Sequence, residues 1–222
     1  MQTILALIKL HDQPLILRHP TPRDGSALHA LIASCPPLDE NSCYCNLLQC
    51  THFAATSLVA ENTVEKLVGS SSGYQLPEDP SVLFVWQVAV GPEARGMGLA
   101  RTLLTTLIER VATVGVTKIH TTITKDNDAS WSLFRSIAEQ LNADLVDQAL
   151  FHQDTHFKGQ HATEHLVEIG PFTLDTAQST KLNADNGNQR SALGTTIVES
   201  SHSRSSTSDD ASFSDHQNGA AA

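Results

Sequence analysis

VWQVAVGPEARGMGLARTLL, from Val85 to Leu104, is the stretch that decides the fold of this chain. It continues the run VLFVWQVAV (82–90), in which every residue except one amide is apolar or favours strands. Such a run predicts a central strand that is covered on both faces. A Gly-Pro pair ends the strand, and leucines at four-residue intervals from Leu99 predict a helix. The segment is therefore a strand, a glycine-rich turn and a helix.

The turn has the chemistry of an anion site. Backbone amides in such a turn, together with the positive end of the helix dipole, bind phosphate groups. Gly96 and Gly98 have no Cβ and let a pyrophosphate approach the main chain, and Arg95 can add a charge-assisted bond. The turn is no Walker A loop, because no Lys-Ser/Thr pair follows, and it lacks the third glycine of a dinucleotide fingerprint.

The rest of the chain alternates between strand and helix patterns. The expected elements are a strand and a helix in 15–35, a hairpin in 56–62 and 66–74, a strand in 116–127, a helix in 128–142 and two strands in 144–151 and 165–172. This order predicts a mixed α/β fold with helices on both faces of one sheet.

Charge and composition narrow the class of protein. The 222 residues include 24 acidic and 14 basic side chains, a formal net charge of −10, and an acidic surface repels nucleic acid. No apolar run reaches the roughly 20 residues that span a bilayer, and the opening MQTILALIKL lacks the basic region of a secretory signal. We therefore expect a cytoplasmic protein with neither nucleic acid nor a membrane as a partner.

The four cysteines, Cys35, Cys43, Cys45 and Cys50, fall between residues 35 and 50. Their spacing lacks the two CxxC pairs of a zinc ribbon, and a disulfide framework needs an oxidising compartment. We expect reduced thiols that pack as small apolar groups, and no bound metal.

Composition changes abruptly after Phe172. Residues 173–222 are rich in Ser, Asn, Asp, Gly and Ala, and they cannot bury enough apolar surface to offset the entropy cost of ordering. We predict a disordered tail at 173–222. A docking or phosphorylation role for this tail is the alternative to a solvated segment without one.

Two motifs resemble the GCN5-related N-acetyltransferase (GNAT) superfamily. RGMGLA (95–100), which opens a helix after a strand, fits the signature R/Q-x-x-G-x-G/A, and NDASWSLF (127–134) is similar to the second acetyl-CoA motif. The resemblance implies a mixed, mostly antiparallel sheet flanked by helices on both faces, with acetyl-CoA as co-substrate. The implied cofactor-binding residues are Val88, Val90, Arg95, Gly96, Gly98, Ala100 and Asn127. Asn127 is alternatively a helix N-cap.

Three further stretches resemble one family in that superfamily, the L-2,4-diaminobutyrate acetyltransferases of ectoine biosynthesis. They are LDENSCYCNLLQCTHFAATSLVAE (38–61), LFVWQVAV (83–90) and TEHLVEI (163–169). The resemblance covers residues 15–172 as a GNAT domain and leaves 1–14 as an N-terminal extension. It implies transfer of an acetyl group from acetyl-CoA to the N4 amine of L-2,4-diaminobutyrate. It also implies a homodimer, and a compatible solute that is made under osmotic stress.

A substrate with two ammonium groups and one carboxylate requires carboxylates and hydrogen-bonding groups in a tight pocket. The substrate-binding candidates are Asp39, Tyr44, Trp86 and Glu164, and the catalytic candidates are Glu164, His161 and Tyr44. Glu164 is the first candidate for the base, His161 is the second, and Asp39 can take this role instead. Each residue also has an ordinary alternative, as a cap, a core aromatic or an exposed strand end.

We expect the amine to attack the thioester directly, with the Val88 amide facing the oxyanion. Many GNAT enzymes have a general-acid Tyr seven residues after the Asn of the second motif, but this chain has Phe134 there, and Tyr44 is the candidate replacement. Three alternatives stay open. They are a ping-pong route through Cys43 or Cys45, an acetyltransferase for another small amine, and a non-catalytic acyl-CoA-binding module.

Overall fold

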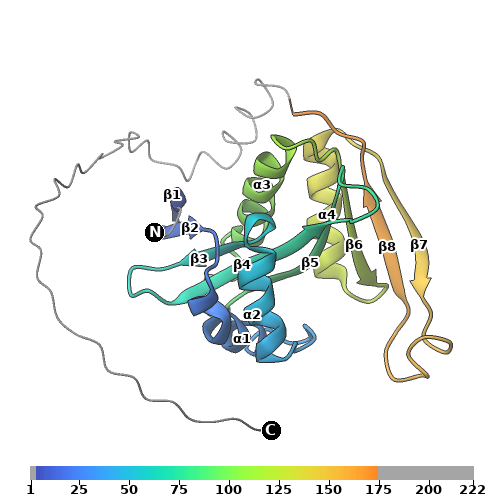
Figure 1. Cartoon of the computed structure of the whole chain (residues 1–222), viewed down its shortest axis with the longest axis horizontal. Helices are drawn as coiled ribbons and strands as arrows, with labels where there is room; N and C mark the ends of the chain where they lie inside the picture. Colours follow the sequence, from blue (N-terminus) through green and yellow to red (C-terminus); the bar gives the residue numbers. More distant parts are fainter. Residues whose placement is uncertain (1–3, 175–222) are drawn as a thin grey trace, which may run out of the picture. The chain divides into compact units, whose positions relative to one another are not determined.

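One eight-stranded sheet runs through the molecule, and the strand at 82–90 lies in its interior (Figure 1). The computed structural model describes residues 4–174. Along the sheet the strands are β1 (Ile4–Leu10), β2 (Gln13–Arg18), β3 (Leu58–Glu61), β4 (Leu67–Gln75), β5 (Val82–Val90), β6 (Lys118–Thr124), β8 (Glu164–Ile169) and β7 (Leu145–Phe151). Neighbouring strands are antiparallel, apart from the parallel pair β5–β6.

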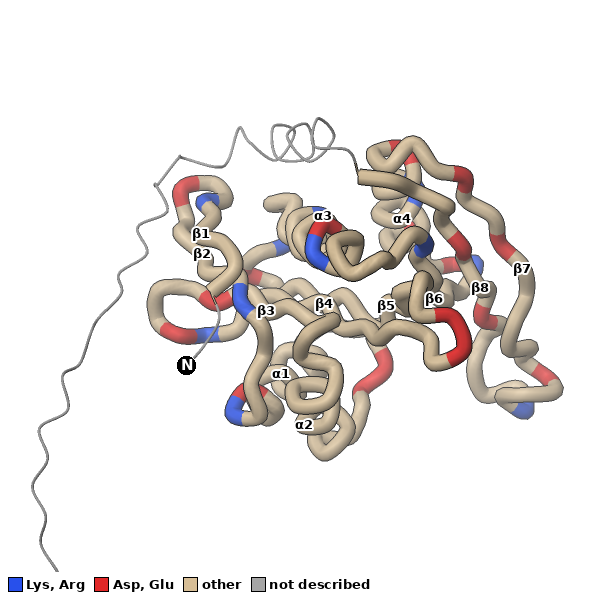
Figure 2. Tube along the Cα trace, turned by 45° about the horizontal axis from the view of Figure 1, so that its top comes forward, with Lys and Arg blue, Asp and Glu red and all other residues tan. Residues whose placement is uncertain are grey.

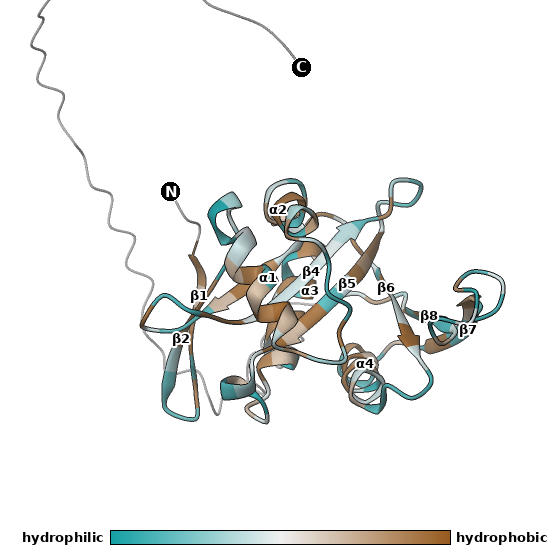
Figure 3. Cartoon of the chain, turned by 90° about the horizontal axis from the view of Figure 1, so that it is seen from below, coloured by the Kyte–Doolittle hydropathy of each residue, from teal (hydrophilic) through white to brown (hydrophobic). Residues whose placement is uncertain are grey.

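Helices cover the sheet on both faces, as predicted. The helices are α1 (Gly25–Ala33), α2 (Cys43–His52), α3 (Leu99–Ala112) and α4 (Asp128–Leu141). Figure 2 shows α1 and α2 on one side of the sheet and α3 and α4 on the other, and in Figure 3, seen from below, α2 and α4 lie on opposite sides of β5. The mixed, mostly antiparallel α/β fold is thus confirmed. None of the helices in residues 4–174 is long and apolar enough to cross a membrane.

The main core lies between the sheet and the pair α3–α4. Leu99, Leu103 and Leu107, the four-residue repeat that predicts α3, are at most 1% exposed. Each buried leucine contributes on the order of 2 kcal/mol through removal of apolar surface from water. Gly69 of β4 lets α3 come this close, since a Cβ there would lie 2.8 Å from Leu99 Cδ2.

Two elements differ from the sequence expectation. Residues 4–10, expected within an N-terminal extension, form the strand β1, which pairs with β2 and buries Ile8 and Leu10. Residues 43–52, expected in a substrate loop, form α2, which begins where Ser42 Oγ accepts a hydrogen bond from the Cys45 amide at 3.1 Å. The predicted tail at 173–222 lies outside the described residues except for its first two positions.

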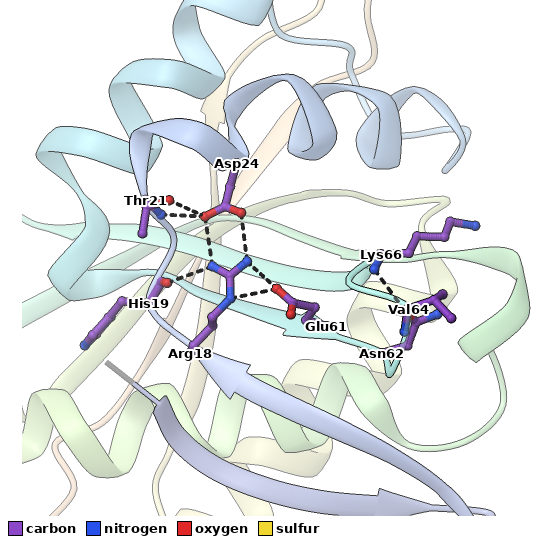
Figure 4. Close-up of polar contacts among 8 residues, drawn as sticks. All are labelled: Arg18, His19, Thr21, Asp24, Glu61, Asn62, Val64 and Lys66. Atoms are coloured by element: carbon purple, nitrogen blue, oxygen red, sulfur yellow. Dashed lines mark hydrogen bonds and ion pairs between the residues drawn. The ribbon is translucent and has the colours of Figure 1, made fainter. Parts of the chain in front are cut away.

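A buried ion cluster fixes the start of α1 against the sheet (Figure 4). Arg18 at the end of β2 donates two bonds of 2.8 Å to Asp24 in the turn η1 (Pro22–Asp24), and its Nε donates to Glu61 of β3 at 2.9 Å. Burial acts to raise the pKa of Asp24, but the bonds from Arg18 and Thr21 outweigh it and lower that pKa below its usual value. Removing one partner would leave an uncompensated buried charge, so this cluster stabilises the fold as a unit.

Candidate active site

A cleft opens where β5 and β6 separate. The two strands pair in parallel only from Val82 with Lys118 to Phe84 with His120. The last link between them is a 3.0 Å bond from Thr121 Oγ1 to the Val85 carbonyl. Beyond it the strands diverge around a cavity of about 590 Å³. The main chain of β5 that faces this cavity can therefore pair with an extended ligand as a missing strand would.

A β-bulge at Trp86 redirects the side chains of β5. Ser72 of β4 pairs with Gln87 and Gly73 pairs with Val85, which leaves Trp86 as the extra residue. An inserted residue reverses the alternation of side chains beyond it. Gln87 consequently turns toward the segment before α2, where its Nε2 donates to the Asp39 carbonyl at 2.8 Å. The sequence prediction did not include Gln87, and only its place as the single amide in an apolar strand marks it.

Four of the predicted cofactor residues, Val88, Val90, Ala100 and Asn127, line the cleft. The Val90 carbonyl already accepts bonds from Arg95 Nε at 3.2 Å and from Cys35 Sγ at 3.3 Å. Val90 therefore has fewer main-chain groups to offer a ligand than Val88 has.

The glycine-rich turn lies next to the cleft, directly before Ala100, and its residues do not themselves line the cavity. Gly96 and Gly98 have φ angles of +73° and +76°, a conformation that strains any residue with a Cβ. No atom lies within 4 Å of a Cβ placed on either glycine, so the space above the turn is open. The first turn of α3 contains no acidic residue, and its free amides suit a phosphate group.

Asn127 combines the two roles that the sequence leaves open. Its Oδ1 accepts from the Ser130 amide at 3.1 Å and so caps α4, and the residue also lines the cleft. The cap uses the side-chain oxygen and leaves the side-chain NH₂ for a ligand. Phe134, one of the buried residues of α4, forms an apolar part of the cleft wall.

Charged side chains meet at the cleft from two distant parts of the chain. His161 Nε2 lies 3.8 Å from Asp39 Oδ2 and 3.8 Å from Glu164 Oε1. His161 Nδ1 is 2.8 Å from the Ala162 carbonyl, which it reaches as a donor, so the other ring nitrogen faces the two carboxylates. The Asp39 side chain is 82% exposed, whereas that of Glu164 is only 18% exposed. A cation between these carboxylates would be attracted to both.

Glu164 has the features of a proton acceptor. Burial raises the pKa of its carboxyl group above the ordinary value, while the Thr122 hydroxyl and His161 act in the opposite direction. Its Oε2 is buried without a hydrogen-bond partner among the described residues. An unpaired carboxylate oxygen beside a cleft is suited to take a proton from a bound ligand.

The two aromatic candidates lie in different places. Trp86 lines the cleft and packs against Phe53 and Tyr74, with ring centroids 6.5 Å and 6.3 Å away. Tyr44, in the first turn of α2, is 70% exposed and is not among the residues that line the cleft. The structure thus brings Asp39, Trp86, His161 and Glu164 together and leaves Tyr44 outside the cavity.

The cysteines are free thiols, and two of them, Cys35 and Cys50, are buried. Burial raises the pKa of the Cys50 thiol to about 12 and also raises the pKa of Cys45. A thiol with a raised pKa is a poor nucleophile because little thiolate is present. Within residues 4–174, no three His, Cys, Asp or Glu side chains are grouped so that they could hold a metal ion.

The cleft can bring two reactants together from opposite sides. An extended carrier can lie along the main chain of β5 with its phosphates on the turn before α3, and a cationic acceptor can sit between Asp39 and Glu164. Separated parallel strands, a bulge in one of them and a glycine-rich turn at a helix start define an acyl-coenzyme A-dependent acetyltransferase of the GNAT class. The profile of the acetyltransferase (GNAT) family matches residues 26–138, slightly more than half of the chain.

Relatives of known family narrow this class. The chain is 48% identical to the L-2,4-diaminobutyric acid acetyltransferase of Methylotuvimicrobium alcaliphilum over 160 residues, which is 72% of this chain and 92% of the relative. It is 44% identical to the enzyme of that name from Halomonas elongata over 170 residues, 77% of this chain and 88% of the relative. The chain therefore belongs to the GNAT acetyltransferases and, among them, to the L-2,4-diaminobutyric acid acetyltransferases.

A solved structure has the same fold. It is the diaminobutyrate acetyltransferase EctA from Paenibacillus lautus, in complex with its substrate L-2,4-diaminobutyric acid and coenzyme A. Its sequence is 36% identical, the TM-score is 0.69, and the match covers 73% of this chain and 98% of that one.

Proposed function

We propose that this chain transfers the acetyl group of acetyl-CoA to the N4 amine of L-2,4-diaminobutyrate, giving N4-acetyl-L-2,4-diaminobutyrate and coenzyme A. The observation that carries the proposal is the carboxylate pair of Asp39 and Glu164, both 3.8 Å from the same His161 nitrogen at the opening between β5 and β6. Two negative groups at this spacing suit a small substrate with two ammonium groups. The names of the relatives support this choice of substrate.

Acetyl-CoA binds through the main chain in this proposal. The pyrophosphate lies on the turn around Gly96 and Gly98, where the amides and the start of α3 provide positive potential. The pantetheine arm pairs with β5 at Val88, and the Asn127 side-chain NH₂ donates a further bond. The acyl carbon then lies between β5 and the carboxylates.

The amine must lose a proton before it can react. An unperturbed alkyl ammonium group has a pKa of about 10.4, so neutralising it at pH 7 costs about 4.6 kcal/mol. Glu164 takes this proton, directly or through water, because its carboxylate is mostly buried and has a free oxygen. Asp39 holds the second ammonium group, and Trp86 closes the wall beside it.

The nitrogen lone pair then attacks the thioester carbon, and the electron pair of the carbonyl moves to its oxygen. The Val88 amide is the candidate donor to this oxyanion. When the carbonyl re-forms, the C–S bond breaks and coenzyme A leaves as a thiolate. The attacking nitrogen loses its second proton to solvent or to this thiolate, which leaves the neutral amide. Phe134 cannot protonate this thiolate, and a thiolate of ordinary pKa leaves without prior protonation, so the site needs no tyrosine at this position.

We also propose a cytoplasmic homodimer that makes a compatible solute under osmotic stress. The exposed apolar residues Val146, Leu150 and Phe151 along the edge strand β7 support an interface with a second copy. The acidic net charge supports the absence of nucleic acid as a partner. Sedimentation of the full chain tests the homodimer, and a monomer at micromolar concentration would contradict it.

The test of the activity compares coenzyme A release with 2,4-diaminobutyrate, ornithine, putrescine and lysine. We expect the highest kcat/KM for 2,4-diaminobutyrate. Preference for another of these amines would favour the second candidate function, an acetyltransferase for a different small amine. The exposed Asp39 side chain leaves room for such an amine to enter the cleft. Binding of acetyl-CoA without turnover of any amine would instead indicate an acyl-CoA-binding module.

A further inference from the structure

We propose that Gln87 is a positioning residue that fixes Asp39 in the cleft and so selects the length of the diamine. The inference rests on the proposed function, because it assumes that Asp39 faces an ammonium group of the substrate. Gln87 does not touch the reacting atoms in this proposal. It acts through the segment 39–41, which precedes α2.

Both ends of the Gln87 amide are used to hold this segment. Gln87 Nε2 donates to the Asp39 carbonyl at 2.8 Å, and Gln87 Oε1 accepts from Asn41 Nδ2 at 2.7 Å. Within residues 4–174, these are the only hydrogen bonds from residues 39–41 to the sheet. Because the bulge at Trp86 turns Gln87 toward this segment, the anchor depends on the same irregularity that shapes the cleft.

The spacing of the two carboxylates depends on this anchor. Glu164 belongs to β8, which pairs on both sides with β6 and β7, so its position is set by the sheet. Asp39 lies outside any helix or strand, and its side chain is mostly exposed. Loss of the Gln87 bonds would free Asp39 to move relative to Glu164. Recognition of the two ammonium groups at one fixed separation would then weaken.

The test substitutes Gln87→Met, which keeps the length of the side chain and removes both bonds. The matched control is Gln75→Met, because Gln75 Nε2 makes the same kind of bond, 2.7 Å to the Pro80 carbonyl, on the neighbouring strand β4 away from the cleft. For Gln87→Met we expect the KM for 2,4-diaminobutyrate to rise about ten-fold. We also expect a smaller preference over ornithine and a KM for acetyl-CoA within about two-fold of wild type. Gln75→Met should leave all three unchanged.

A purely structural role is excluded by a double-mutant cycle with Asp39→Asn. If Gln87 acts through the Asp39 carboxylate, Gln87→Met should change KM little in the Asp39→Asn background. A second variant, Asn41→Ala, breaks one of the two bonds without altering the sheet, and it should give a smaller rise in KM. It keeps the test possible if Gln87→Met fails to fold.

Two outcomes would contradict the positioning role. The first is a normal KM for 2,4-diaminobutyrate in both Gln87→Met and Asn41→Ala. The second is a rise in this KM on Gln87→Met that is equally large in the wild-type and Asp39→Asn backgrounds. A wild-type protein that acetylates no diamine would overturn the proposed function instead, so the two failures are distinguishable.

Discussion

The two walls of the cleft are built in different ways. The carrier wall, formed by β5 and the turn at 95–100, offers main-chain groups, two glycines with positive φ and the start of a helix. The acceptor wall, formed by residues 38–42, His161 and Glu164, offers side chains that come together from distant segments. In the proposed binding mode the carrier wall contacts only the part that all acyl-coenzyme A molecules share, so it can bind any of them. Specificity for the amine must therefore lie in the acceptor wall.

The largest effect on activity is expected from Glu164→Gln, a substitution in the acceptor wall. This change keeps the shape of the side chain but removes the proposed proton acceptor, so kcat/KM for 2,4-diaminobutyrate should fall on the order of 10²- to 10⁴-fold. Binding of acetyl-CoA should stay unchanged, because the carrier wall is untouched. Steady-state kinetics with calorimetry of acetyl-CoA binding measures both. A normal kcat would remove Glu164 from the role of base.

A second prediction concerns pH. The charged form of Glu164 is the one that can accept a proton. Burial raises the pKa of this group, so its charged form is less favoured in the folded protein. As pH falls, kcat/KM should therefore decline at a higher pH than an ordinary Glu, near 4.3, would give. The contribution of Glu164 to the free energy of unfolding is fully present at acid pH, where its carboxyl group is protonated. It is lost as pH rises through the pKa of this group in the folded protein.

Glu164→Gln should consequently melt no lower than wild type at pH 7, although it is far less active. Thermal melting beside the pH–rate profile tests this pair of effects. A clear loss of stability at neutral pH would mean that the carboxylate has a structural partner, and the account of its pKa would be wrong.

The smallest effect is expected from the cysteines near the acceptor wall. Burial raises the pKa of Cys45, and a direct attack by the amine requires no thiol. Cys43→Ser and Cys45→Ser should each keep kcat within about two-fold of wild type. Mass spectrometry after incubation with acetyl-CoA alone should find no acetylated cysteine. An acetyl-cysteine that transfers its acetyl group to added diamine would establish the ping-pong route.

How much could be predicted from sequence also differs between the walls. The carrier wall follows from local rules, since an apolar run, a glycine-rich turn and a four-residue leucine repeat lie within one short stretch. The contact of Asp39 with His161 spans more than a hundred residues, and the family resemblance indicated both residues without predicting this contact. Gln87 could not be predicted, because its direction depends on a bulge that simple alternation does not reveal. The helix α2 was missed because its capping serine lies in a stretch rich in cysteine and amide side chains.

The central claim is that the carrier wall binds acetyl-CoA and the acceptor wall binds the amine. One paired kinetic measurement on Gly98→Ala and Asp39→Asn tests it most directly. A Cβ at Gly98 would strain the backbone at φ +76°, so the turn that we propose to hold the pyrophosphate should shift. The account predicts that Gly98→Ala raises the KM for acetyl-CoA about ten-fold and leaves the KM for 2,4-diaminobutyrate unchanged, and that Asp39→Asn does the reverse. If each variant instead raised both KM values by similar factors, the two walls would not act separately, and the account would be contradicted.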